Sequence, residues 1–124
     1  MATTKASFYT EVLRELKVVG PNGTASAEDT QRVTDAYTRV WDMLFNRDLV
    51  TWQYADSLPD WAVLPLTKMV SFAVAPRFAI KGERLLMLKQ EGEIDAERPS
   101  WAERQLRKQV AKKFVPSTLS NNYF

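Results

Sequence analysis

The chain has no cysteine and no histidine among its 124 residues. Without cysteine it forms neither disulfide bonds nor thiolate sites, and without histidine it lacks the most frequent general base and metal ligand. It has only four glycines, which favours helices joined by short connections over a sheet with many turns. No apolar run approaches the roughly 20 residues of a membrane span, and the N-terminus lacks the apolar core of a signal peptide. We therefore expect a soluble protein that is made in the cytoplasm.

The missing residue types also limit the possible chemistry. Ser-His-Asp and Cys-His catalytic sites are excluded because each needs a residue that the chain lacks. Acidic residues gather at positions 91–97, but they alternate along a polar stretch that contains Gly92, which is typical of a solvated segment. A hydrolase that uses only carboxylates needs two acids held in a cleft, and no pattern indicates a cleft. We expect that the protein is not an enzyme and has no cofactor or metal ligands.

The apolar content is sufficient for one folded domain. Hydrophobic residues make up 45% of the chain, including four Trp, six Phe and four Tyr, and 124 residues is a common domain size. The spacing of these residues predicts an all-α fold, a small bundle of about five helices with an extended arm and an extended C-terminal tail.

Apolar stripes predict the first two helices. The first helix is expected over residues 4–19 and the second from a cap at Ser26. The apolar stripe of the first helix is Phe8, Val12, Leu16 and Val19. The stripe of the second helix is Val33, Tyr37, Val40 and Leu44. Trp41 and Phe45 form a second row on the second helix, so its apolar sector is broader than one partner helix requires. This helix is therefore either a central core helix or one that also contacts a neighbouring subunit.

The middle of the chain predicts an arm and two further helices. Val50, Trp52 and Tyr54 alternate with other residues, which indicates a short extended arm. A third helix should follow Pro59, bury Ala62, Leu66, Met69 and Ala73 with Val63, Val70 and Val74, and end before Pro76. A fourth helix is expected from Gly82 or Glu83 to Gln90. The charged residues 91–98 that follow are either a linker or a frayed helix end.

A fifth helix should begin with a capping box, Ser100 to Glu103, and end before Pro116. Ala102, Leu106, Val110 and Phe114 recur every four residues along it. Residues 1–98 carry 12 basic and 14 acidic side chains, whereas residues 99–124 carry five and one. We therefore separate a helical-bundle domain, 1–98, from a basic helix and tail, 99–124.

The cations of the fifth helix lie outside its apolar stripe. They are Arg104, Arg107, Lys108, Lys112 and Lys113. Such a row can neutralise phosphates of nucleic acid, dock on an acidic protein surface, or form an ordinary solvated face. The sequence leaves these three interpretations open.

The last ten residues, 115–124, have no charged side chain but several apolar ones. These are Val115, Pro116, Leu119, Tyr123 and Phe124. Chain ends are usually disordered unless something holds them, so this tail is either a disordered end or a segment that orders on a partner.

The order of these elements resembles a known family. Leu58-Pro59-x-Trp61 leads into a helix that ends Phe72-Ala73-Val74-Ala75-Pro76-Arg77-Phe78, and a short helix with Leu85-Leu86 follows. Asp35-Ala36 and Trp41 occupy the second helix. Over residues 5–98 this order is similar to that of the head-to-tail adaptor proteins, or tail accessory factors, of short-tailed bacteriophages.

The resemblance implies a virion structural protein. Twelve copies would form a ring beneath the portal protein in the neck of the virion, after assembly in the host cytoplasm. The ring would lengthen the DNA channel, retain the packaged DNA, and dock the tail hub or nozzle protein. Residues 115–124 would bind the portal, and DNA would make non-specific contacts at most.

We expect the contact between copies at Trp41, Phe45, Val50, Trp52 and Tyr54, because the second helix and the arm have surplus apolar surface. The alternative function is a small helical DNA-binding protein that uses the basic fifth helix alone.

Overall fold

The computed structural model describes residues 2–20, 23, 25–95 and 97–114, with side chains up to Ala111. The helices within them are α1 Lys5–Glu15, α2 Ala27–Asn46, α3 Asp60–Val74, the 3-10 helix η1 Ala75–Phe78, α4 Glu83–Gly92 and α5 Trp101–Phe114. The strands among these residues, β1 Ala2–Thr3 and β2 Leu58–Pro59, pair antiparallel. The predicted all-α class is confirmed.

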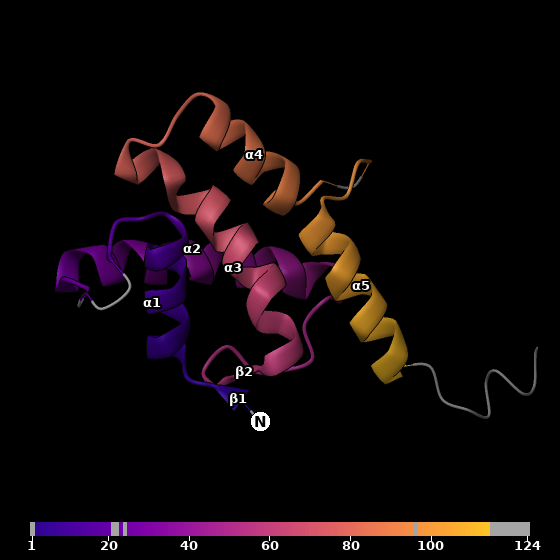
Figure 1. Ribbon diagram of the computed structural model, residues 1–124. Helices are drawn as coiled ribbons and strands as arrows, with labels where there is room; N and C mark the ends of the chain where they lie inside the picture. The colour runs from indigo at the N-terminus through magenta and orange to yellow at the C-terminus, as the bar shows by residue number, and fades with distance from the viewer. Residues whose placement is uncertain (1, 21–22, 24, 96, 115–124) are drawn as a thin grey trace, which may run out of the picture.

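Helix α3 is the centre of the bundle. It contacts α1, α2, α4 and α5, and Figure 1 shows it crossing the middle of the molecule with α4 above it and α5 to its right. Its buried residues include Leu66, Met69, Val70 and Val74, as predicted. Ala73 is exposed, contrary to prediction. A helix with neighbours on most sides must be apolar on most sides, which explains its composition.

The predicted stripes of α1 and α2 face α3 and are buried. All eight of their residues, from Phe8 to Leu44, belong to the core cluster. Ser26 caps α2 as expected, since its Oγ accepts a hydrogen bond from the Asp29 N–H at 3.1 Å. Helix α1 ends at Glu15, earlier than predicted, because Lys17 takes a left-handed conformation with φ of 60° that stops helical hydrogen bonding.

The connection from α4 to α5 differs from the prediction at its start. Helix α4 runs to Gly92, two residues further than expected, and Gly92 packs against the backbone of α3 at Lys68. Leu88 is buried in this contact face, whereas Leu86 is exposed. Ala102 and Leu106 of α5 belong to the same core cluster as the first four helices. The division at residue 98 therefore marks a change in charge and not the end of the core.

The predicted arm is irregular chain that folds back on α2. Trp52 Nε1 donates to Tyr37 Oη at 3.0 Å, and the hydroxyls of Tyr54 and Thr38 are 2.7 Å apart. The Tyr54 ring stacks on that of Tyr37 with 5.5 Å between centroids. These contacts hold the segment against the outer side of the core. The alternation of Val50, Trp52 and Tyr54 therefore results from their partial burial and not from a β-strand.

Candidate interaction surfaces

An aromatic pocket lies between the end of α2 and the segment that follows it. The rings of Trp41 and Phe45 are stacked with their centroids 5.1 Å apart, because residues four apart are neighbours on a helix. With Val50, Thr51, Trp52 and Gln53 they line a shallow pocket of about 230 Å³. The structure thus brings together four of the five residues predicted for the subunit contact.

The fifth predicted contact residue, Tyr54, does not line the pocket but packs against Trp41, which does. Its ring meets Trp41 edge-on at 5.9 Å. Trp41, Val50, Trp52 and Tyr54 are all half-buried, whereas Phe45 is 57% exposed. Phe45 thus exposes an aromatic ring at a pocket that the polar Thr51 and Gln53 also line, an arrangement that suits a contact with a partner.

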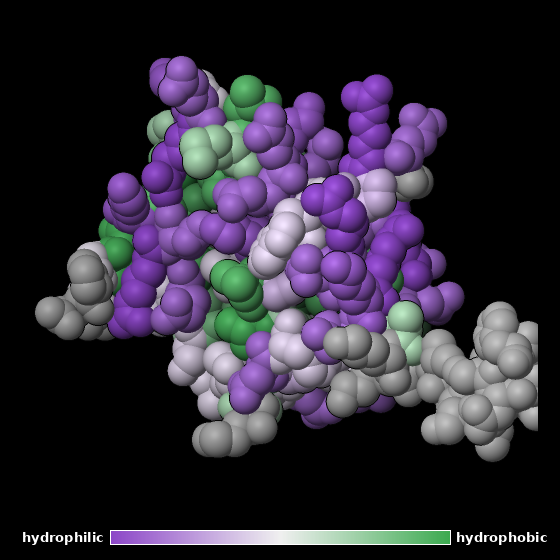
Figure 2. Space-filling model, turned by 45° about the vertical axis from the view of Figure 1, so that its right-hand side comes forward, coloured by the Kyte–Doolittle hydropathy of each residue, from purple (hydrophilic) through white to green (hydrophobic). Residues whose placement is uncertain are grey.

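Other large apolar side chains are exposed on several elements. They are Val18, Met43, Leu64, Leu86 and Met87. On the face shown in Figure 2 hydrophilic side chains predominate and hydrophobic ones form small, separate patches. Met43 borders a second hollow of about 220 Å³ with Met69, Phe72 and Ile94. None of these surfaces was predicted, because an isolated exposed residue has no periodic signal.

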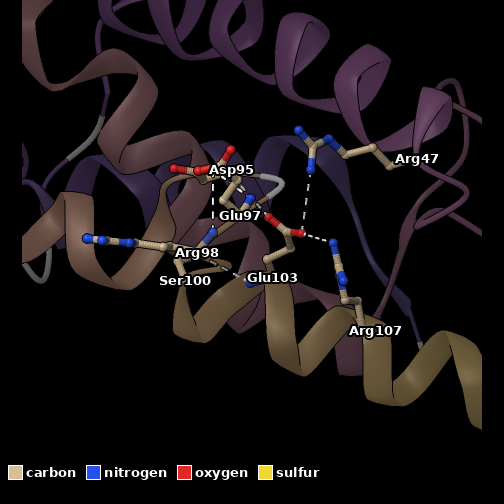
Figure 3. Close-up of polar contacts among 7 residues, drawn as sticks. All are labelled: Arg47, Asp95, Glu97, Arg98, Ser100, Glu103 and Arg107. Atoms are coloured by element: carbon tan, nitrogen blue, oxygen red, sulfur yellow. Dashed lines mark hydrogen bonds and ion pairs between the residues drawn. The ribbon is translucent and has the colours of Figure 1, made fainter.

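A buried carboxylate lies where α2, α5 and the segment before α5 meet (Figure 3). Glu103 is fully buried, and its Oε2 is 2.5 Å from Arg107 Nη2 and 3.6 Å from Arg47 Nη1. Its Oε1 accepts a hydrogen bond from the Asp95 N–H at 3.1 Å. Two cations and a backbone donor compensate the charge, as burial of a carboxylate requires.

The predicted capping box is confirmed in one half only. Ser100 Oγ accepts a hydrogen bond from the Glu103 N–H at 3.3 Å, so Ser100 is the cap. The Glu103 side chain, expected to return to the backbone of Ser100, instead turns into the protein toward Arg47. Arg47 was not among the predicted site residues, since no local pattern connects it with α5.

The acidic cluster at 91–97 has structural partners. Asp95 Oδ1 accepts hydrogen bonds from the N–H groups of Glu97 and Arg98, which lower the pKa of Asp95, and the nearby charges of Arg47 and Arg98 lower it further. Glu91 pairs with Lys68 at 3.4 Å, and Glu93 lies 4.0 Å from Lys89. Glu91, Glu93 and Asp95 are half-buried with these partners and only Glu97 is exposed, so the cluster is solvated only in part, whereas the sequence predicted a solvated segment.

The basic residues of α5 form a row on its outer side. Arg104 and Lys108 are exposed and have no ion pair within the described part of the chain. Arg107 is 48% exposed and is bound to Glu103. We call Arg47, Arg104, Arg107 and Lys108 the basic row. The side chains of Lys112 and Lys113, also predicted for it, lie outside the described residues.

The predicted tail residues are likewise outside the described residues. They are Val115, Pro116, Leu119, Tyr123 and Phe124. Within the described ranges, no group of three or more acidic side chains is arranged to hold a metal ion. None of the helices in those ranges has the length and apolar character to cross a membrane.

Comparison with known proteins gives no match to a protein-family model, a curated protein or a solved structure.

Proposed function

We propose that this chain is a virion structural protein, a head-to-tail adaptor that forms a ring beneath the portal of a short-tailed bacteriophage. The ring extends the DNA channel, retains the packaged DNA and docks the tail. The order of sequence elements over residues 5–98 and the all-α bundle support this proposal. The observation that carries it is the exposed Phe45 ring, which stacks on Trp41 and lines the aromatic pocket with it.

The contact between copies uses this aromatic pocket. A ring closes when one surface of each copy binds a different surface of the next. Aromatic side chains seated in pockets supply most of the free energy at such contacts. Because Trp52 and Tyr54 are hydrogen-bonded to α2, the pocket is already formed before a neighbour binds and loses little entropy on binding.

The tail, residues 115–124, attaches the ring to the portal. It follows α5 directly in the sequence and has apolar side chains but no charged ones. A segment of this kind gains main-chain hydrogen bonds and pocket contacts when it orders on a partner. The portal contact is therefore separate from the contact between copies, and each can be removed without the other.

The test is reconstitution with the matching portal. Purified full-length chain and portal are mixed, and the product is imaged by electron microscopy. We expect a ring of copies beneath the portal, which is lost when residues 115–124 are deleted. Circular dichroism of the truncated chain controls for folding, and the Lys81→Ala variant, changed at an exposed site between η1 and α4, should dock normally.

A monomer that leaves the portal unoccupied would refute the proposal. Equal docking of the truncated and the full-length chain would refute the role of the tail alone.

The second candidate is a small helical DNA-binding protein. Arg104 and Lys108 favour it, since they are exposed and have no ion pair among the residues that the structure describes. Such a protein would bind duplex DNA as a single copy and with steep salt dependence. It would have no affinity for a portal. Reconstitution therefore distinguishes the two candidates.

A further inference from the structure

We infer that the basic row, made by the outer face of α5 together with Arg47, contacts the phosphate backbone of duplex DNA in the channel of the assembled ring. This inference rests on the proposed function, because it takes the ring and its channel as given. It adds a binding site, a class of ligand, and the side of the subunit that faces the DNA.

Glu103 holds the guanidinium groups of two arginines in place. One buried carboxylate oxygen binds Arg47 from the end of α2 and Arg107 from α5. A guanidinium has five N–H donors, so a single contact with Glu103 leaves most of them available. Arg47 remains 30% and Arg107 48% exposed, which leaves these donors access to solvent. Both groups are therefore held in place at the surface before a ligand arrives.

The remaining cations of the row lie close together along α5. Arg104 and Lys108 are four residues apart, so they lie about 6 Å from each other along the axis of α5. Arg107 lies between them in sequence and points toward Glu103, as does Arg47 (Figure 3). Because they are three and four residues apart, Arg104, Arg107 and Lys108 share one face of α5. A strand of duplex DNA is a regular series of negative charges, so it can contact several of these cations at once. A single carboxylate cannot do so.

Several acidic side chains lie near the row. Glu103 is buried within it, Asp48 follows Arg47, and Asp95 and Glu97 lie on the segment before α5. Asp95 is bound to the backbone N–H groups of Glu97 and Arg98. With Glu103 and Asp95, the exposed Asp48 and Glu97 equal the four cations of the row in number, and the adjacent exposed Arg98 brings the region to a net charge of +1. Within the row, Arg104 and Lys108 are the cations that have no acidic partner in the described part of the chain.

The lack of large exposed apolar side chains on the described part of α5 favours DNA over a protein as the partner. Protein interfaces need an apolar or aromatic centre that excludes water. No large apolar side chain is exposed between Trp101 and Ala111, so the α5 part of the row has no apolar anchor. The exposed Met43 and Phe45 lie on α2, before Arg47. In Figure 2 the right-hand side, where α5 comes forward, is mainly hydrophilic. A charged surface without an apolar anchor fits a polyanion, since DNA interfaces are polar and strongly basic.

The contact is independent of base sequence. Backbone phosphates position a protein without reporting sequence, and Arg and Lys on an outer helix face suffice for this. A channel must hold and release a whole genome of any sequence. Many weak, salt-sensitive contacts from a ring of copies meet both needs, because repetition multiplies a small affinity.

The experiment measures DNA binding by the portal–adaptor complex. Fluorescence anisotropy follows a labelled random-sequence duplex between about 50 and 200 mM salt. The test variant is Arg104→Gln with Lys108→Gln, and the matched control removes two exposed cations elsewhere, Arg39→Gln with Lys81→Gln. Neither Arg104 nor Lys108 has an ion pair in the described structure, so the test variant should fold and assemble normally.

We expect the test variant to bind DNA more weakly and to make the logarithmic salt slope shallower by about 2 per copy in contact. The control should keep the slope. Arg47→Gln alone should make the slope shallower by about 1, which identifies the contribution of α2.

Equal losses in the test variant and its control would show that only net charge matters and would overturn the inference. Loss of portal docking with unchanged DNA binding would overturn it in favour of an acidic protein partner. A ring that forms on the portal but never binds DNA would overturn it and leave the proposed function intact. Absence of the ring would instead overturn the proposed function.

Discussion

Gly92 of α4 lies directly on the backbone of Lys68 in α3. A Cβ atom at Gly92 would be 2.3 Å from the Lys68 carbonyl oxygen and 2.9 Å from the Met69 nitrogen. Such distances are far inside van der Waals contact, and the obstructing atoms belong to a central helix. The absence of a side chain therefore sets how closely α4 approaches α3.

The Gly92→Ala variant should be clearly less stable than the wild type. Alanine favours the helix by about 1 kcal/mol, but forcing the two helices apart should cost about 3 kcal/mol or more. Urea unfolding measures the difference. Gly20→Ala is the matched control because a Cβ there has no atom of the described residues within 4 Å, and the stability of this variant should change little. An unchanged Gly92→Ala variant would mean that α4 does not pack as described.

The same glycine shows where sequence-based prediction of the fold fails. The stripe of α2 and its cap at Ser26 were predicted correctly, since periodicity and capping are local properties. Gly92 was assigned to a linker or a frayed helix end because its neighbours are charged and glycine usually ends helices. Its actual role depends on Lys68, which is distant in sequence and adjacent only after α3 and α4 have packed.

At the candidate surfaces, too, contacts within one helix were predicted and contacts between distant segments were not. Trp41 and Phe45 were predicted as neighbours because they are four apart on one helix. The position of Arg47 beside Glu103 was not predicted, because the Ser100 to Glu103 spacing has a local explanation that accounted for the carboxylate. A local motif therefore concealed a contact between distant segments.

Two buried tyrosines should make the protein less stable at high pH. Burial raises the pKa of Tyr9 and Tyr37 to about 12. In the unfolded chain these phenols ionise near 10, whereas in the folded protein they stay neutral until about 12. The unfolded state therefore gains stability as the pH rises between these values. The free energy of unfolding should fall by about 1.4 kcal/mol per pH unit for each tyrosine.

Urea unfolding between pH 9 and about 11.5 tests this dependence, and phenolate absorbance reports the ionisation directly. Tyr37→Phe should lower stability at neutral pH, because Trp52 Nε1 loses its acceptor, and should give a shallower decline at high pH. Lys68 adds to the decline in both proteins: partial burial lowers its pKa, but Glu15 and Glu91 raise it by more. A decline as steep in Tyr37→Phe as in the wild type would contradict the prediction.

Glu103 and its arginines should be strongly coupled. Glu103→Gln should cost about 2–4 kcal/mol, because the removed charge leaves two guanidiniums without their partner. Arg107→Gln should cost more than Arg47→Gln, since its contact is 2.5 Å and the other 3.6 Å. In the Glu103→Gln background both arginine substitutions should be nearly neutral.

A double-mutant cycle gives the coupling, expected at about 1–3 kcal/mol for Glu103 with Arg107. The exposed pair Glu11–Arg14, 3.0 Å apart on α1, is the control and should give less than about 0.5 kcal/mol. Equal coupling in the two pairs would mean that burial of Glu103 adds nothing.

Phe45 should matter for assembly and little for folding. Its ring is 57% exposed, so Phe45→Ser should change the free energy of unfolding by less than about 1 kcal/mol. A central aromatic contact at an interface is worth about 2 kcal/mol or more, so association between copies should weaken about 30-fold.

Leu64→Ser is the matched control, because Leu64 is 55% exposed on α3 and does not line the pocket. Sedimentation velocity over a concentration series, with and without portal, measures association. If both variants associate alike, the aromatic pocket is not the contact between copies, since loss of apolar surface anywhere would then have the same effect.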